Sequence, residues 1–161
     1  MGRAEQHLVS RAGSGAHGLH LLFPGDAQSV RQALKTAMAA FREMPLGGSL
    51  SGVVEIVLAE VLNNVVEHAY AEHGRGVVEV EVELTPAGLA FCVRDDGRPM
   101  PMGDMPVGAA HDLDVAADDL PEGGFGWFLI RELTEELCYR RIGNRNQLSF
   151  RIARDANAAT P

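Results

Sequence analysis

Hydrophobic residues follow two different spacings along this chain, one typical of strands and one typical of helices. Short segments in which apolar residues alternate with polar ones, or form a brief apolar run, predict strands. These segments are 19–23, 78–84, 89–93, 138–142 and 148–152. Between them, apolar residues recur every three or four positions, which predicts helices. The expected order is therefore strand, helix, helix, two strands, a long loop, a helix and two strands.

Three helices are expected, and their ends carry recognisable residues. Asp26 or Ser29 can cap the first, the second begins near Ser49 or Ser51 and ends within 70–74, and the third opens at Gly124 or Gly126. The segment 97–124 is rich in glycine, proline and acidic residues and predicts a long irregular loop. A loop of that length in a compact domain is usually functional or mobile.

One strand indicates how the layers are arranged. Glu79, Glu81 and Glu83 alternate with apolar residues, so one face of that strand meets water. Helices are then expected on the other face alone. The fold class we predict is a two-layer α/β sandwich with a mixed, mostly antiparallel sheet and helices on one face. A single domain is expected over 17–154, with a flexible leader at 1–16 and a flexible tail at 155–161.

Composition excludes several classes of protein. The formal net charge of −8 over 161 residues disfavours direct nucleic-acid binding, which relies on clustered positive charge. No uninterrupted apolar run approaches the ~20 residues that span a bilayer, and no signal peptide is evident, so we expect a cytoplasmic protein without membrane contact. Lys35 is the single lysine, which argues against a lysine-dependent phosphate loop.

The second predicted helix carries a row of polar side chains that packing does not require. Glu60, Asn64 and His68 are spaced by four and therefore lie above one another on a helix surface. A carboxylate can orient or deprotonate a hydroxyl, and an amide oxygen is a suitable ligand for Mg²⁺. The alternative interpretation is a solvated helix face.

Two further motifs follow in order. Asp95-Asp96-Gly97-Arg98 stands at a strand end, where a carboxylate can accept a hydrogen bond from an exocyclic amine and a glycine lets a planar ring approach. Gly124-Phe125-Gly126 opens a helix, where free N–H groups form a seat for phosphate. The alternatives are a plain turn and a flexible helix entry.

In combination these motifs resemble the ATP-binding fold of the GHKL superfamily, known as the Bergerat fold. Glu60-x-x-x-Asn64-x-x-x-His68 is similar to its N box, Asp95-x-Gly97 to its G1 box, and Gly124-x-Gly126 to its G2 box. Within the superfamily, the chain most resembles the bacterial anti-sigma factor serine kinases. The resemblance covers about residues 18–153 and includes Asp95 to Pro99, Gly123 to Arg131, Phe23-Pro24-Gly25 and Asn146-x-Leu148.

The resemblance implies roles for individual residues. Glu60 would be the base that prepares a serine hydroxyl, Asn64 the Mg²⁺ ligand, and Asp95 the acceptor for the adenine amine, with Gly97 beneath the ring. Gly124, Phe125 and Gly126 would line the phosphate seat. The remaining candidates for ATP contact are His68, which would orient its neighbours, and Arg98 and Arg131, which would lie near phosphates.

The function implied is that of an ATP-dependent serine protein kinase and anti-sigma regulatory factor. Its expected partners are a sigma factor and a STAS-type anti-anti-sigma protein, whose serine it would phosphorylate, and the expected assembly is a homodimer. The alternative is a catalytically weak or inactive module that sequesters a partner. Two departures from the family pattern motivate that alternative: Trp127 directly after Gly126, and a strongly acidic loop.

Overall fold

The structure is a computed structural model that describes residues 18–70, 76–100 and 125–154, where the expected order of elements is confirmed. The strands are β1 (Gly18–Pro24), β2 (Val77–Thr85), β3 (Gly88–Asp95), β4 (Glu135–Ile142) and β5 (Arg145–Ala153). The helices are α1 (Ala27–Arg42), α2 (Gly48–Asn64), a π-helical turn η1 (Val65–Ala69) and α3 (Phe125–Leu133). The predicted leader 1–16, the tail 155–161 and most of the acidic loop lie outside the described residues.

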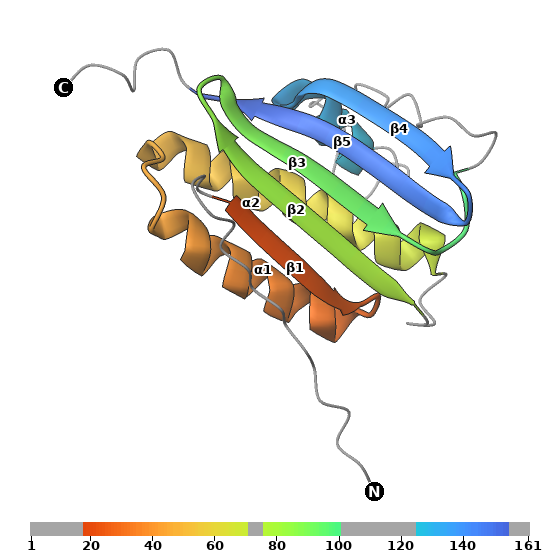
Figure 1. Cartoon of the computed structure of the whole chain (residues 1–161). Helices are drawn as coiled ribbons and strands as arrows, with labels where there is room; N and C mark the ends of the chain where they lie inside the picture. The colour runs from red at the N-terminus through yellow and green to blue at the C-terminus, as the bar shows by residue number, and fades with distance from the viewer. Residues whose placement is uncertain (1–17, 71–75, 101–124, 155–161) are drawn as a thin grey trace, which may run out of the picture.

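The five strands form one sheet, with helices packed on one of its faces (Figure 1). The strand order is β1-β2-β3-β5-β4, and each pair of neighbours is antiparallel, so the described sheet is antiparallel rather than mixed. The last strand in sequence therefore lies between β3 and β4. The two-layer α/β sandwich with helices on one face is confirmed.

The helix starts follow local chemistry. Asp26 caps α1, since its carboxylate accepts hydrogen bonds from the Ser29 backbone N–H at 2.8 Å and from the Ser29 hydroxyl at 2.7 Å. For α2 the expected start, Ser49 or Ser51, was wrong by one or three residues. Gly47 occupies the cap position without a side-chain hydrogen bond, and the helix begins at Gly48 rather than at a serine.

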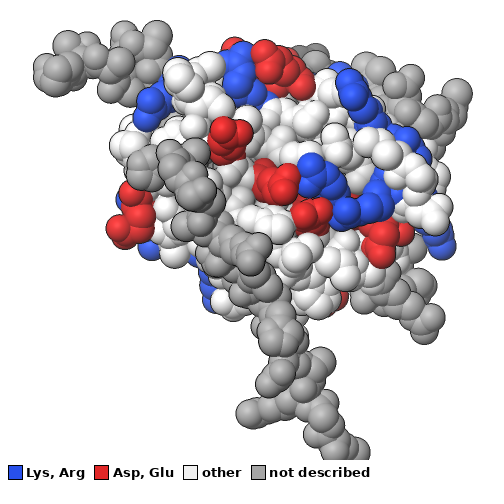
Figure 2. Space-filling model, in the orientation of Figure 1, with Lys and Arg blue, Asp and Glu red and all other residues white. Residues whose placement is uncertain are grey.

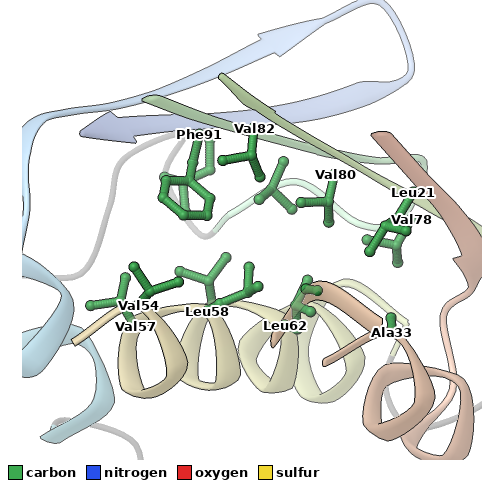
Figure 3. Packing of buried hydrophobic residues seen from close by; sticks show 14 of the residues in the cluster. Leu21, Ala33, Val54, Val57, Leu58, Leu62, Val78, Val80, Val82 and Phe91 are labelled. Carbon is green, nitrogen blue, oxygen red and sulfur yellow. The ribbon is translucent and has the colours of Figure 1, made fainter. Parts of the chain in front are cut away.

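The hydrophobic core lies between α2 and the inner face of the sheet (Figure 3). Val54, Leu58 and Leu62 of α2 face Val80 and other inward residues of the central strands, and all of these side chains are buried. The stretch Gly48–Ala69, with a mean hydropathy of 1.5, is long and apolar enough to cross a membrane by length and composition. Because its apolar side packs under the sheet, we interpret it as the core helix of this domain.

Tyr70 joins four separate segments at the end of this helix. Its ring lies where a side chain on Gly25 or Gly76 would collide with it. Its hydroxyl donates its single hydrogen to the Asp96 carboxylate, lies 3.0 Å from the carbonyl oxygen of Val77, and accepts from the Asp96 N–H. Burial and the hydrogen bond to the Asp96 carboxylate raise the pKa of Tyr70, while the same hydrogen bond lowers the pKa of Asp96. The residue after β3 is thereby fixed against the end of the long helix.

The outer face of the sheet is polar and carries a connected ion-pair network (Figure 2). Arg94 contacts Glu81 at 2.8 Å and Glu79 at 3.5 Å, and Glu79 also pairs with His20 and with Arg145. Burial alone would raise the pKa of Glu79, but these partners outweigh burial and lower it. His20, Glu79 and Glu81 bring potential ligand atoms within 4.8 Å of one another, yet the two arginines already neutralise the carboxylates.

The Tyr70 contact gives a prediction about two glycines. Gly25→Ala places a methyl group against the Tyr70 ring and should lower the free energy of unfolding by about 1–3 kcal/mol. Gly52→Ala, on an open side of α2 with no atom within 4 Å, should raise it by about 0.5–1 kcal/mol. Urea unfolding of both variants measures the difference. Equal stabilities would contradict the role assigned to Tyr70.

Candidate functional site

A cavity of about 500 Å³ opens between α2, η1, the central strands and the segment that follows β3. Ligand pockets in proteins commonly have volumes of ~300–1,000 Å³ and are mostly apolar with a few placed polar groups. The polar residues that line this cavity are Asn64, His68, Asp95, Arg98, Tyr139 and Asn146. The apolar residues that line it include Val61, Val65, Val93, Met100, Trp127 and Leu148. The cavity therefore has the composition of a small-molecule site.

Asp95 is the buried acid of this cavity, with 5% of its surface exposed. Its Oδ1 accepts hydrogen bonds from the Gly97 N–H at 2.9 Å and from the Asn146 amide at 2.8 Å. Within the described ranges, no hydrogen bond reaches Oδ2. Burial raises the pKa of Asp95, and the two hydrogen bonds offset this in part. One oxygen is thus held by the protein, and the other is left for a donor on a ligand.

Asn146 fixes this carboxylate from the neighbouring strand β5. Its amide nitrogen donates to Asp95 and, at 2.7 Å, to the carbonyl of Arg98. Its Oδ1 accepts from the Tyr139 hydroxyl at 2.6 Å and from Arg141 at 2.9 Å. These four hydrogen bonds use both donors and both lone pairs of the amide. A fully satisfied buried amide is a rigid support, because rotation would break several bonds together.

The segment after β3 is held on both sides. The Arg98 N–H donates to the Ala69 carbonyl at 2.8 Å, which ties the segment to η1. On the opposite side, Arg141 donates to the Gly97 carbonyl at 2.8 Å and Tyr139 accepts from the Met100 N–H at 3.0 Å. A Cβ at Gly97 would lie 2.5 Å from the Ala69 carbonyl oxygen, so backbone packing by itself requires a glycine here; the predicted approach of a planar ring to Gly97 stays a prediction.

Asn64 and Glu60 meet the start of α3. A Cβ built at Gly126 would lie 2.5 Å from Oε2 of Glu60 and 3.9 Å from Oδ1 of Asn64. The glycine therefore lets the third helix approach the polar side chains of α2 closely. The amide nitrogen of Asn64 is buried, with no hydrogen-bond partner in the described part of the chain. Such a buried polar atom carries a desolvation cost of about 1–3 kcal/mol, which a ligand would relieve.

The polar row on the helix continues into an irregular turn. After Asn64 the helix widens to π geometry, and the Tyr70 N–H bonds the Val65 carbonyl at 3.2 Å. A π-helical turn changes the direction of the side chains that follow, and such turns are frequent at functional sites. His68 lies in this turn, is exposed, and lines the cavity together with Asn64. Glu60 does not line the cavity itself; it lies one turn earlier, against Gly126.

The other predicted site residues divide into three groups. Gly97 and Arg98 belong to the segment at the cavity, and Arg98 lines it with its side chain exposed. Phe125 and Arg131 lie on α3, both exposed, and neither is among the cavity-lining residues. Gly124 lies outside the described residues. The ligand-binding roles assigned to all of these positions stay predictions.

Sequence reasoning did not assign four residues that shape the site: Trp127, Tyr139, Arg141 and Asn146. Trp127 is buried at the start of α3 and forms part of the cavity wall. Trp127 carried a signal in the sequence, because it departs from the family pattern after Gly126. Asn146 also carried one, because Asn146-x-Leu148 resembles the family. Tyr139 and Arg141 have no such motif, because their role depends on the pairing of β4 with β5.

A family profile described as a histidine kinase-like ATPase domain matches residues 23–152. The chain belongs to this family. No curated protein matches the sequence. The expected superfamily is thereby confirmed, and the antiparallel sheet with its helices is consistent with the GHKL fold. Membership of the narrower family, the anti-sigma factor serine kinases, stays a prediction.

The residues present fit the Mg²⁺ and nucleotide that this family implies. Asn64 lies in the cavity wall, and its amide nitrogen has no hydrogen-bond partner among the residues that the structure describes; a 180° rotation of the amide exchanges its nitrogen and oxygen. Amide and carboxylate oxygens suit a hard divalent cation. The free oxygen of Asp95 offers an acceptor at the other side of the cavity. A base with an exocyclic amine and a metal-bound polyphosphate together match this donor set.

The Asn146 support can be tested by a matched pair of substitutions in one hairpin. Asn146→Ala removes four hydrogen bonds, deprives the Arg98 carbonyl of the Asn146 donor, and leaves the Asp95 carboxylate with the Gly97 N–H alone among the donors described above. We expect the free energy of unfolding to fall by about 2–3 kcal/mol. Asn144→Ala, at an exposed turn position, should change it by less than ~0.5 kcal/mol. Similar free energies of unfolding for the two variants, measured in denaturant, would refute the supporting role of Asn146.

Proposed function

We propose that this protein is an ATP-dependent serine protein kinase that also acts as an anti-sigma regulatory factor. The observation that carries the proposal is Asp95, a buried carboxylate that lines the cavity. Asn146 and Gly97 hold one of its oxygens, and among the described residues no hydrogen bond reaches the other. An acceptor fixed in this way selects a ligand with a donor, and adenine presents its exocyclic amine. The family profile supports ATP as the nucleotide.

The proposed reaction transfers the γ-phosphoryl group of ATP to a serine hydroxyl of a partner protein. Phosphoryl transfer depends mainly on positioning and on stabilising negative charge. Glu60 is the proposed general base, and it would accept the serine proton as the oxygen bonds to phosphorus and ADP leaves. The proximity of Glu60 to Gly126 supports this role, because the predicted phosphate seat lies at that helix start.

Asn64 is the proposed ligand for Mg²⁺. The cation, once held there, would neutralise negative charge that develops on the phosphate during transfer. His68 and Arg98 border the same cavity, and we propose that they orient the phosphates and their neighbours. Phe125 and Arg131 of α3, together with Gly124 before it in the sequence, are proposed to complete the phosphate region.

The proposed partners are a STAS-type anti-anti-sigma protein, which receives the phosphate, and a sigma factor. The kinase would bind the sigma factor once the phosphorylated STAS-type protein has been released. We propose a homodimer that works in the cytoplasm. A second candidate, a nucleotide-binding module without useful catalysis, has one observation in its favour: bulky Trp127 occupies the cavity wall beside the predicted phosphate seat. Nucleotide binding and phosphate transfer, measured separately, distinguish the two.

Catalysis is tested with Glu60 and a neighbour on the same helix. Glu60→Gln removes the proposed base and should lower the rate of serine phosphorylation at least ~100-fold. Glu55→Gln, on the exposed side of α2, should leave the rate within about twofold. The assay follows phosphoserine on STAS-domain proteins from the same genome after incubation with ATP and Mg²⁺. Equal phosphoserine from both variants would refute the role of Glu60.

Metal-dependent ATP binding is tested with two adjacent asparagines. Trp127 is the single tryptophan of the chain and lies in the cavity wall, so its fluorescence reports ligand binding directly. Asn64→Ala should weaken Mg²⁺-dependent ATP binding by about tenfold or more, because the proposed metal ligand is lost. Asn63→Ala, which is exposed, should bind as the wild type does. Wild-type protein that shows no Mg²⁺ effect would count against the metal site.

A further inference from the structure

The hairpin between β4 and β5 carries a charge opposite to that of the whole chain. Positions 139–146 contain three arginines, Arg140, Arg141 and Arg145, and no acidic residue, whereas the chain has a formal net charge of −8. In Figure 2, basic side chains gather on the side of the molecule where Figure 1 places this hairpin turn. We define the basic hairpin patch as Arg140, Arg141, Ile142 and Arg145.

The patch combines charge with an exposed apolar side chain. Ile142 is 58% exposed and stands between the arginines. Arg140 is exposed and makes no ion pair or hydrogen bond with the described residues. Arg145 pairs with Glu79 yet keeps 47% of its side chain exposed. Arginine is enriched at protein interfaces, and the fully buried part of an interface is more apolar than the rest of the surface. Arginines beside an exposed isoleucine therefore suit a protein-docking surface.

The patch is continuous with the rim of the cavity. Arg141 donates both to the Gly97 carbonyl and to Asn146, and Asn146 donates to the Arg98 carbonyl. Tyr139, at the base of the same hairpin, lines the cavity. β4 is an edge strand, so the tip of the hairpin has no further strand of this sheet beside it. Arg141 is paired with Asn146 and lies on the cavity side of the sheet, whereas Arg140 and Ile142 are paired with Gln147 and Arg145 and lie on its outer side. A protein seated on the patch would therefore cover this edge of the sheet, next to the rim of the cavity.

We propose that the basic hairpin patch docks the protein substrate of this kinase through an acidic surface that carries an apolar pocket for Ile142. This inference rests on the proposed function, since it names the surface that brings a serine to the cavity. Complementary charge would speed encounter and fix orientation, while Ile142 would supply burial. A protein partner is favoured over nucleic acid because the chain as a whole is strongly acidic.

The test measures binding independently of phosphate transfer. Full-length protein with ADP is titrated against a panel of purified STAS-domain proteins from the same genome, by biolayer interferometry. Arg140→Glu and Ile142→Ser should each raise the dissociation constant of an acidic panel member about tenfold. Lys35→Glu makes the same change of charge on the exposed side of α1 and should alter it by less than about twofold. The Arg140 effect should shrink as salt is raised.

Folding and nucleotide binding are controlled in the same variants, whose Trp127 fluorescence titration with ATP should match the wild type. Dissociation constants for Arg140→Glu and Ile142→Ser that equal the Lys35→Glu value overturn the docking proposal. Failure of every panel member to bind wild-type protein also overturns it, as does a patch that is required for binding duplex DNA or RNA instead.

The same mixtures, supplied with ATP and Mg²⁺, separate this proposal from the proposed function. A panel member that binds through the patch without receiving phosphate supports the docking surface and refutes the kinase activity. Phosphate transfer that is equally fast with Arg140→Glu at limiting partner concentration supports the kinase and refutes the docking surface.

Discussion

The hydrogen bond between Asp95 and Asn146 is the contact on which the site depends. It joins the ends of two neighbouring strands, and through the other bonds of Asn146 it also holds Tyr139, Arg141 and the carbonyl of Arg98. A carboxylate that is 5% exposed would be costly to bury without such partners. Because one oxygen is satisfied internally, the remaining oxygen has a fixed direction. The two oxygens of Asp95 thus have different roles: one anchors the side chain, and the other can accept a hydrogen bond from a ligand.

The fold was largely predictable from the sequence because its layers obey simple periodicities. The alternation of Glu79, Glu81 and Glu83 with valines identified the exposed face of the sheet, and that face is free of helices in the described structure. The position of β5 was not predictable in this way. Strand alternation fixes which face is buried, but it contains no information about which strand becomes the neighbour of β3.

The parts of the candidate site that lie in short contiguous motifs were predictable from the sequence. The parts that depend on which strands pair in the sheet were not. Asn64, Asp95 and Gly97 each belong to a short string whose chemistry can be read locally. The structure places Asn64 and Asp95 in the wall of one cavity, and Gly97 in the segment that borders it. Tyr139 and Arg141 look like ordinary strand residues until β4 pairs with β5. The π-helical turn was also invisible, since a spacing of four between Asn64 and His68 reads as a continuous α-helix.

The strand order has a consequence for how the protein is made. The strand that supplies Asn146 is made after β3, and the amide is separated from its carboxylate by 51 residues. Until β5 emerges from the ribosome, the edge of β3 that it will cover is unpaired, with Leu89, Phe91 and Val93 lacking their neighbours on β5. Unpaired apolar edges are sites of misassociation in growing chains. The cavity is therefore completed only after β5 has been made, and a chain truncated before residue 146 lacks the support of its pocket.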